Sequence, residues 1–441
     1  MKVRMLTIRT SLMALALLYC VSASAQDEQL LWIRAGQVLD GNGGAHRPGA
    51  VLVRGERILA VGPVGARPEG AEALDLGDAT LLPGLIDLHT HMTDKVGIHW
   101  EEVLVATTPP QAVLHGARNA LDTLRAGFTT VRDMGPTWPF TDVDLRDAID
   151  EEVVPGPRMQ VAGSYVSATG GAGDARQFSI YLDVPIVQNL ADGVDAVRGA
   201  VRTNFKHGAD FIKILATGAV LSKGISPGAQ QYTDEELAVA VEEANRWGRF
   251  VASHAHGPEG IKASIRAGVR TIDHGSMIDS EGVALLAEHP ETYFVPTLYV
   301  IGAVAAEGDE LGVPLSEIER SRRMLDFING AFRSVLEAGL PIGFGTDAGV
   351  FAHGQNAREF ALRVRQGQDE MAAIVSATSV SAMIMGWDDR IGSIEPGKFA
   401  DLIAVAGDPL EDISELERMA WVMKGGAIYR DELSEPTRVT R

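Results

Sequence analysis

The sequence predicts an α/β protein built on a (β/α)8 TIM barrel, and three observations predict it. Eight β-type runs occur in order, each followed by a candidate helix, which is the alternation of such a barrel. The chain has 441 residues, 46% of them apolar and 22% charged, so it can bury one barrel of roughly 300 residues beside a small accessory domain. Polar residues that suit metal binding end several runs, where barrel enzymes keep their catalysts.

The first predicted element is an export signal. Basic residues precede an apolar run over 12–21, and Ala-Ser-Ala at 23–25 offers the small residues that a signal peptidase reads. A transmembrane anchor needs about 20 apolar residues, and this run is about half as long. We therefore expect a signal peptide over 1–25 and a periplasmic or secreted mature protein that begins at Gln26 and has no membrane anchor. Removal of the signal peptide also removes Cys20, the only cysteine. Disulfide and thiol chemistry are therefore excluded for the mature protein.

The barrel strands are predicted within residues 83–390. The eight runs cover 85–92, 128–134, 158–167, 211–217, 250–256, 271–277, 293–300 and 342–348. Helical patterns lie between them, among others over 111–126, 196–207, 233–247 and 315–338. Thr233 before Glu236 has the spacing of a helix-capping pair, which predicts a helix start there.

The two flanks of the barrel follow a different pattern. Residues 30–79 and 391–429 contain short β-type runs separated by Gly-rich turns, and residues 431–441 are expected to form a tail. The net charge of −20 repels nucleic acid and anionic membranes, so neither is expected as a partner. We expect a small molecule or a dipeptide as the substrate.

The most informative motif is LPGLIDLHTHM, in which His89 and His91 end an apolar run. In a strand, residues i and i+2 point to the same side, so a His-x-His pair can present both imidazoles to one divalent metal ion. The pair alone is weak evidence, because a single histidine near a strand end is more often a satisfied polar residue. Four further residues end or lie in other runs: Lys213, His254, His274 and Asp347. Six matched positions favour a metal centre at the C-terminal end of a barrel.

Lys213 and Asp347 each have two interpretations. Lys213 lies inside the apolar run FIKIL, where an unpaired ammonium is costly, so it either pairs with a neighbouring carboxylate or loses its proton to desolvation and nearby cations. A neutral lysine can react with carbon dioxide and bridge two metal ions as a carbamate. Asp347 is either a turn residue before glycine or a carboxylate that takes a proton from the nucleophile and returns it to the leaving nitrogen.

Further polar and aromatic residues are predicted on the catalytic side. His256 shares the strand face of the histidine two positions before it, and because the metal set is complete without it we expect it to bind substrate or carry protons. Tyr232 precedes a helix start, so it is either a neighbour of the helix cap or a substrate-binding residue. Trp100, Trp138 and Phe140 follow the first two runs and either shape the pocket or cover the barrel rim.

These motifs resemble the amidohydrolase superfamily of metal-dependent hydrolases over residues 30–429. The segments VLVRGERILAVG, LPGLIDLHTH, IGSIEPGKFADLIAV and VMKGGAIYR are similar to sequence motifs of that superfamily. The branch of prolidase-like dipeptidases, imidazolonepropionase-like proteins and ochratoxin-degrading amidohydrolases is similar in VRDMG, FIKILATGAVLS and HAHGPEGIKASIRAGVRTIDHGS. The resemblance implies that residues 26–82 and 391–430 fold together as a small β-sandwich beside the barrel.

The same resemblance implies a binuclear zinc hydrolase of carbon–nitrogen bonds, and we also expect a homo-oligomer. A hydroxide that bridges the two ions is the expected nucleophile, and the branch uses a tyrosine in the region of Tyr232 for the substrate carboxylate. The leading substrates are amides of a C-terminal amino acid, namely Xaa-Pro dipeptides, N-acyl amino acids and ochratoxin A, which would give ochratoxin alpha and phenylalanine. The expected ligands are His89, His91 and Asp347 for one ion, His254 and His274 for the other, and carbamylated Lys213 for both.

Two other classes of protein make different predictions. A mononuclear hydrolase or deaminase of a cyclic amide or ring, such as an imidazolone, would lack the lysine in the fourth run and carry an acid near the fifth. Here Lys213 is present, and Glu259 is the only acid close to that run. A catalytically inactive binding protein would have lost ligands, and none is missing. The loops after the strands decide the substrate, so the sequence leaves its identity open.

Overall fold

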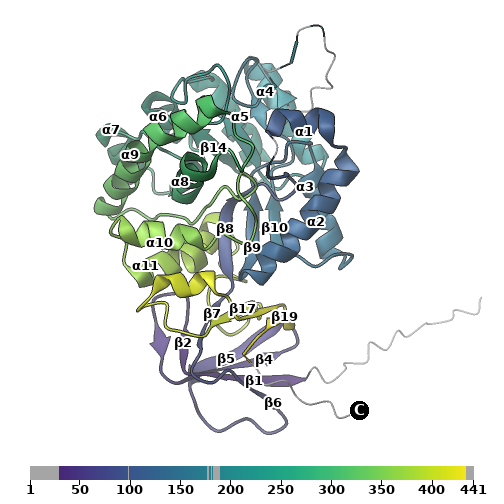
Figure 1. Ribbon diagram of the computed structural model, residues 1–441, viewed down its shortest axis with the longest axis vertical. Coiled ribbons are helices and arrows are strands. Elements are labelled where there is room, and N and C mark those ends of the chain that lie inside the picture. Colours follow the sequence, from purple (N-terminus) through teal and green to yellow (C-terminus); the bar gives the residue numbers. More distant parts are fainter. Residues whose placement is uncertain (1–28, 98, 176–177, 180, 182–188, 434–441) are drawn as a thin grey trace, which may run out of the picture.

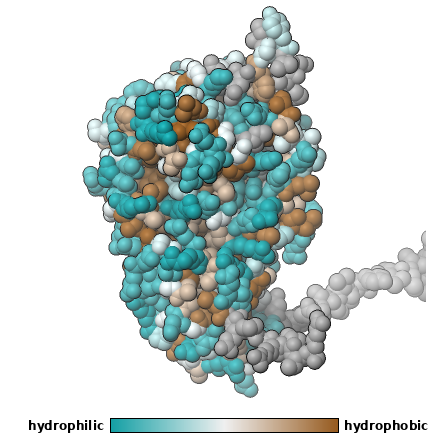
Figure 2. Space-filling view, in the orientation of Figure 1, coloured by the Kyte–Doolittle hydropathy of each residue, from teal (hydrophilic) through white to brown (hydrophobic). Residues whose placement is uncertain are grey.

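The computed structural model describes residues 29–97, 99–175, 178–179, 181 and 189–433. The predicted signal peptide lies outside the described residues, as does most of the predicted tail. No helix of the described part is both long enough and apolar enough to cross a membrane. On the face drawn in Figure 2, hydrophilic residues predominate and hydrophobic residues form separate small groups.

Both ends of the chain contribute to one β-rich part, which lies below the α/β part in Figure 1. One sheet has the order β5-β4-β1-β6, and the other has the order β19-β18-β17-β7-β2-β3. The antiparallel pairing of β7 with β17, with Leu81 opposite Ala404, joins the two ends, and Ile33, Leu81 and Trp421 belong to an apolar cluster shared by both sheets. The strands are β1 (Leu30–Ala35), β2 (Gln37–Leu39), β3 (Ala45–His46), β4 (Gly49–Arg54), β5 (Arg57–Pro63), β6 (Glu72–Asp75), β7 (Thr80–Pro83), β17 (Leu402–Val405), β18 (Trp421–Lys424) and β19 (Ala427–Asp431).

Between these ends, strands and helices alternate, which confirms the predicted α/β class. The strands pair in parallel with their sequence neighbours, and helices lie outside them (Figure 1). The strands are β8 (Leu85–Thr90), β9 (Phe128–Asp133), β10 (Arg158–Val161), β11 (Val166–Ser167), β12 (Asn189–Leu190), β13 (Ile212–Leu215), β14 (Val251–Ala255), β15 (Thr271–His274) and β16 (Tyr293–Val295). The helices are α1 (Trp100–Ala106), α2 (Pro109–Arg125), α3 (Thr141–Asp150), α4 (Val194–Lys206), α5 (Asp234–Arg246), α6 (Pro258–Ala267), α7 (Ser280–Glu288), α8 (Leu298–Glu307), α9 (Leu315–Glu337), α10 (Arg358–Arg365), α11 (Glu370–Val375) and α12 (Ser381–Met385).

Helix boundaries follow the predicted capping signals. At the start of α5, the Thr233 hydroxyl accepts from the backbone N–H of Glu236, and the Glu236 carboxylate accepts from the backbone N–H of Thr233. This reciprocal pair satisfies two backbone donors that the first turn leaves without partners. The predicted helix start is therefore confirmed. A π-helical turn (Ser376–Val380) joins α11 to α12, and a 3-10 turn (Ile413–Glu417) follows β17.

The eighth predicted run, residues 342–348, is not a regular strand but lies between β16 and β8. Gly343 donates to the Phe294 carbonyl at 2.9 Å, and Leu88 of β8 donates to the Phe344 carbonyl at 2.8 Å. Only isolated bridges form on its two sides, from Ile342 to Phe294 and from Ala348 to Thr90, and Asp347 has a positive φ of 67°. The segment nevertheless carries Asp347 to the same end as the last residues of β8.

Two other predicted strands were too long. The run over 158–167 divides into β10 and β11, and between them Gly163 has a φ of 76°, outside the strand region. The run over 293–300 ends at Val295, because Pro296 has no N–H to continue the ladder and α8 begins two residues later at Leu298.

Candidate active site

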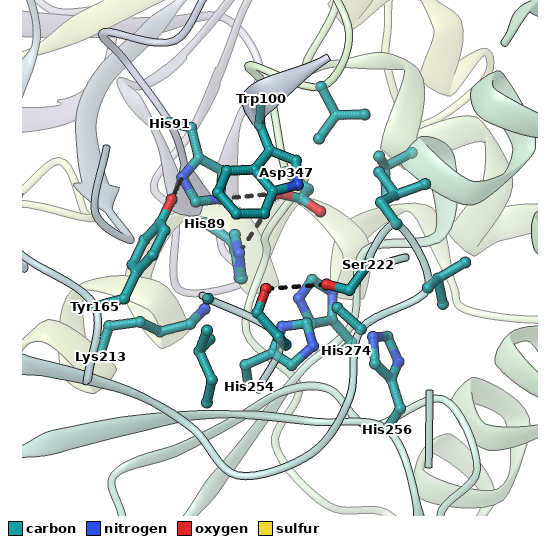
Figure 3. A pocket seen from close by; sticks show the side chains of 18 of the residues that line it. His89, His91, Trp100, Tyr165, Lys213, Ser222, His254, His256, His274 and Asp347 are labelled. Carbon is teal, nitrogen blue, oxygen red and sulfur yellow. Dashed lines mark hydrogen bonds and ion pairs between the residues drawn. The ribbon is translucent and has the colours of Figure 1, made fainter. Parts of the chain in front are cut away.

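The predicted metal ligands come together at the C-terminal ends of the parallel strands, where they line one pocket of about 870 Å³ (Figure 3). The lining includes His89, His91, Lys213, His254, His274 and Asp347, together with His256. Tyr232, which was predicted to bind substrate, does not line this pocket, because it is buried in the large apolar cluster. Its position therefore gives no support to the predicted contact with a substrate carboxylate.

A buried ion pair fixes the imidazole of His89. His89 Nδ1 lies 3.0 Å from Asp273 Oδ1, which also accepts from Arg132 Nη2 at 2.9 Å. Arg132 is held in turn by the Leu88 carbonyl and Thr271 Oγ1. Burial raises the pKa of Asp273, but Arg132 and His89 outweigh burial and hold that pKa well below its usual range. The ionised carboxylate therefore accepts a hydrogen bond from the Nδ1–H, which leaves His89 Nε2 to bind a metal ion.

A backbone carbonyl fixes His91 in the same way. His91 Nδ1 lies 2.6 Å from the Gly135 carbonyl oxygen, and the Tyr165 hydroxyl donates to the same oxygen at 2.5 Å. Because a carbonyl only accepts, Nδ1 donates, so Nε2 is the nitrogen that can face a metal ion. Gly135 has a φ of 97°, and a Cβ there would lie 2.6 Å from the Tyr165 ring. Glycine is therefore required for the tyrosine to reach this carbonyl.

Three histidine rings form the other side of the pocket. The Nδ1 atoms of His274 and His256 each lie 2.8 Å from a hydroxyl, of Thr297 and Ser276 respectively. The Nε2 atom of His254 is buried and has no hydrogen-bond partner in the described structure. A buried polar nitrogen without a partner costs free energy, and this cost is removed if the nitrogen binds a cation.

The donor set fits divalent metal ions. Candidate ligand atoms of His89, His274 and Asp347 lie within 4.8 Å of one another, and those of His254, His256 and His274 do the same. Imidazole nitrogens and carboxylate oxygens are ligands that zinc prefers. The second group includes His256, which we had predicted to bind substrate or carry protons. This group therefore offers three imidazole ligands, whereas the prediction assigned two histidines, His254 and His274, to that ion.

The protonation states suit metal binding. Burial and the Lys213 charge lower the pKa of His89 to about 4, and burial with neighbouring histidines lowers that of His254 well below its ordinary value. Neutral imidazoles have the lone pair that a metal needs. Burial also lowers the pKa of His91, but the hydrogen bond and charge of Asp347 outweigh burial and raise it to about 9. The Asp347 carboxylate thus favours positive charge beside His91, and a metal ion can supply that charge.

Backbone strain marks two of the ligands. His274 and Asp347 have φ values of 68° and 67°, in the left-handed region that costs a non-glycine residue about 1 kcal/mol or more. The neighbour Thr346 is held by Asp87, which accepts from its backbone N–H at 3.1 Å and from its hydroxyl at 2.5 Å, while Asn356 donates to Asp87 at 2.8 Å. Such strain persists where surrounding contacts fix the backbone, and it is typical of active sites.

The pKa of Lys213 is low enough for part of its side chains to be deprotonated near neutral pH. Its side chain is only 2% exposed, and burial lowers the pKa of its ammonium to about 8 although Asp273 and Asp347 act in the opposite direction. A neutral amine is nucleophilic and can react with carbon dioxide. The position therefore meets the chemical requirement of the predicted carbamate.

Several site residues were not predicted from the sequence. Tyr165 lines the pocket. Arg132 of β9 and Asp273 of β15 support His89. The signal for the last two was a charged residue within each apolar run, next to a predicted strand end. Of the aromatic residues considered, Trp100 lines the pocket, whereas the indole N–H of Trp138 donates to Thr107.

Comparisons with known proteins agree with this site. Residues 80–428 match the amidohydrolase family. Ochratoxinase of Aspergillus niger is 31% identical over 434 residues, which covers 93% of this chain and 88% of ochratoxinase. Among solved structures, a Xaa-Pro dipeptidase with methionine bound in its active site has a TM-score of 0.85 at 36% identity, over 91% of this chain and 100% of that chain. A prolidase complexed with N-methylphosphonate-L-proline has a TM-score of 0.85 at 31% identity, with the same coverage.

Fold and site together define a hydrolase whose polar residues converge at the ends of parallel strands and can hold metal ions. The chain belongs to the amidohydrolase family, and it is a hydrolase that acts on amide bonds. Members of this family are generally metal-dependent, in agreement with the donor set.

Proposed function

We propose that the protein is a binuclear zinc hydrolase that cleaves the amide bond to a C-terminal amino acid. The observation that carries the proposal is that six predicted ligands meet in one pocket, with the second ring nitrogens of His89 and His91 already occupied by hydrogen bonds. In this proposal one ion binds to His89, His91 and Asp347, the other binds to His254 and His274, and Lys213 binds to both after carbamylation by carbon dioxide.

Bound divalent metal supplies a nucleophilic water at neutral pH and polarises the scissile carbonyl. Asp347 handles the protons. Burial raises the pKa of Asp347, but His89 and His91 outweigh burial and lower it, so the carboxylate is ionised and can accept a proton from the attacking water. The same oxygen then returns the proton to the leaving nitrogen, which makes one residue base and acid in turn. Apolar pocket walls such as Ile301 and Val350 exclude bulk water and strengthen these interactions.

A substrate with a free C-terminal carboxylate is supported by the relatives. One is named ochratoxinase, another is a Xaa-Pro dipeptidase, and a third is a prolidase with a proline phosphonate bound. We propose Xaa-Pro dipeptides, N-acyl amino acids and ochratoxin A as candidate substrates. His256 lines the pocket with its ring held by Ser276, and we assign it as a donor to the carboxylate, since a charged acceptor strengthens such a hydrogen bond. Tyr232 has no part in this proposal.

We also infer that β8, β9, β10, β13, β14, β15, β16 and residues 342–348 form a closed (β/α)8 barrel and that the two sheets of the β-rich part form a sandwich. Hydrogen bonds on both sides of residues 342–348 support closure, and the shared apolar cluster supports the sandwich. Export of the chain through residues 1–25 remains a proposal from the sequence.

A substrate screen tests the proposed function. The zinc-loaded mature protein should hydrolyse members of a panel of Xaa-Pro dipeptides, N-acyl amino acids and ochratoxin A, and chelation should abolish the activity. The same panel should contain imidazolones, other cyclic amides and lactones. Turnover confined to the ring compounds would contradict the proposed substrate class and favour the ring hydrolase that the sequence left as the alternative.

A further inference from the structure

A second cavity lies beside the central pocket. It comprises about 520 Å³ of space, part of it open to solvent, between α1, the loop that joins α8 to α9, and the loop after Asp347. We call it the side chamber. Its lining includes Val96, Val103, Leu311, Val313 and Glu317, none of which lines the central pocket.

The side chamber and the central pocket share one wall. Asp94, Trp100, Thr137, Leu221 and Val350 line both cavities. Trp100 is labelled in Figure 3 among the side chains of the central pocket, with His91 and Asp347. A group of a substrate whose scissile bond lies at the predicted metal ligands would therefore reach the side chamber at this wall, beside Trp100.

The walls select for an apolar group. Val103 is 3% exposed, and the other walls named above are mostly valine and leucine, so an apolar ligand group gains free energy by leaving water. The indole of Trp100 offers an aromatic face at the shared wall, against which an aromatic ligand group can pack.

The polar lining of the chamber holds residues of both charges. Glu317 is buried, and its Oε2 lies 3.4 Å from His99 Nε2, so these two groups already interact with each other. Asp94 and Lys95 add one acidic and one basic residue. An acidic ligand group gains no uniform field from this lining and would lose its own hydration, which is unfavourable in a confined cavity.

From this arrangement we propose that the side chamber is a specificity pocket for a bulky apolar, preferably aromatic, side chain that flanks the scissile bond. The inference rests on the proposed function, because it gives that reaction its side-chain preference. Substrates with phenylalanine or leucine are therefore turned over faster than those with alanine, and those with aspartate or glutamate are the poorest.

A filled chamber tests this inference. Val313 is only partly buried and lies in a loop, so Val313→Trp can fill the chamber without disturbing a strand or helix. Leu315→Trp is the matched control, because Leu315 is 62% exposed and lines neither cavity. Phe-Pro carries its aromatic group on the acyl side of the scissile bond, and N-acetylphenylalanine carries it on the leaving side. Loss of an apolar subsite should reduce kcat/KM by about tenfold or more for the compound whose aromatic group enters the chamber. The alanine analogues should change little in Val313→Trp, and neither series should change in Leu315→Trp.

Binding of free amino acids separates this inference from the proposed reaction. Calorimetry on the zinc-loaded full chain should give tighter binding of L-phenylalanine than of L-alanine, and Val313→Trp should remove the difference. If no amide is hydrolysed but this binding pattern is found, the proposed reaction is wrong and the specificity pocket stands. Equal binding of the two amino acids, or an equal loss for both in Val313→Trp, would overturn the inference. Unfolding midpoints close to that of the wild type establish that the variants are folded.

Discussion

Single buried charges hold the predicted metal ligands in place. The clearest case is Asp273, whose Oδ1 serves both His89 and Arg132. In Asp273→Asn the His89 proton loses its charged acceptor and the buried Arg132 loses its counter-ion. Loss of the partner that orients a metal-binding histidine reduces metal affinity about 10–100-fold, and an uncompensated buried charge destabilises by about 3–5 kcal/mol.

Zinc titration and denaturant unfolding measure both effects of Asp273→Asn. Asp195→Asn is the control, since its side chain is fully exposed on α4, and it should change neither quantity. Wild-type zinc affinity in the folded Asp273→Asn protein would contradict the assigned role of the carboxylate.

Tyr165 acts on His91 through one shared carbonyl. Tyr165→Phe keeps the ring against Gly135 but removes the hydroxyl that donates to the Gly135 oxygen. His91 is then less firmly oriented, so zinc affinity should fall by about tenfold while the unfolding midpoint changes little. Tyr429→Phe, in β19 of the β-rich part, is the matched control. An unchanged zinc affinity in Tyr165→Phe would show that the hydroxyl does not position His91.

At the scale of residues, the sequence predicted which residues meet in the pocket but not the residues that support them. The positions of His89, His91, Lys213 and Asp347 could be predicted because each ends or lies in an apolar run. Asp273 could not be assigned to His89, because the partners are far apart in the sequence and only the sheet brings them together. The burial of Tyr232 could not be predicted either, since proximity to a helix start does not determine whether a side chain faces the pocket or the core.

Among the elements, the eighth segment depends most on small residues. A Cβ at Gly345 would lie 2.7 Å from a Val295 methyl and 3.1 Å from His89 Cβ, so Gly345→Ala should push this segment away from β8. We expect reduced zinc affinity and a loss of stability of about 1–3 kcal/mol. Gly330→Ala in α9 has nothing within 4 Å of the new methyl group, and it should stabilise the protein by about 0.5–1 kcal/mol. Equal effects of the two substitutions on unfolding would contradict this close packing.

The order and type of the elements could be predicted, but their ends could not. Periodicity and capping predicted α5 and the parallel strands, because these signals are local in the sequence. The irregular backbone of residues 342–348 could not be predicted, since the positive φ of Asp347 is imposed by contacts with β8 and Asp87.

For the whole molecule, one aromatic residue connects the two parts. The guanidinium groups of Arg57 from β5 and Arg158 from β10 each lie 3.7 Å from the centre of the Phe399 ring, and Arg158 also pairs with Asp401 at 2.8 Å. Two cation–π contacts of about 0.5–1 kcal/mol each, with the buried ring area, suggest that Phe399→Ala lowers the free energy of unfolding by about 2 kcal/mol.

Zinc content should stay at the wild-type level in Phe399→Ala, because no ligand lies near this contact. Phe327→Ala on α9 serves as the control, since Phe327 is 56% exposed. A stability loss in Phe399→Ala no larger than that of the control would show that the contact does not join the two parts.

We propose that six residues at the strand ends hold two metal ions and that Lys213 binds to both. This proposal can be tested by metal analysis of the wild type and of Lys213→Ala, with and without a short carboxylic acid. We expect about two zinc ions per chain in the active wild type. We also expect lower zinc content and activity reduced by orders of magnitude in Lys213→Ala, with partial recovery of both when the acid replaces the missing carbamate. One zinc ion per chain in fully active wild type, or near-normal zinc content and turnover in Lys213→Ala, would contradict the proposal.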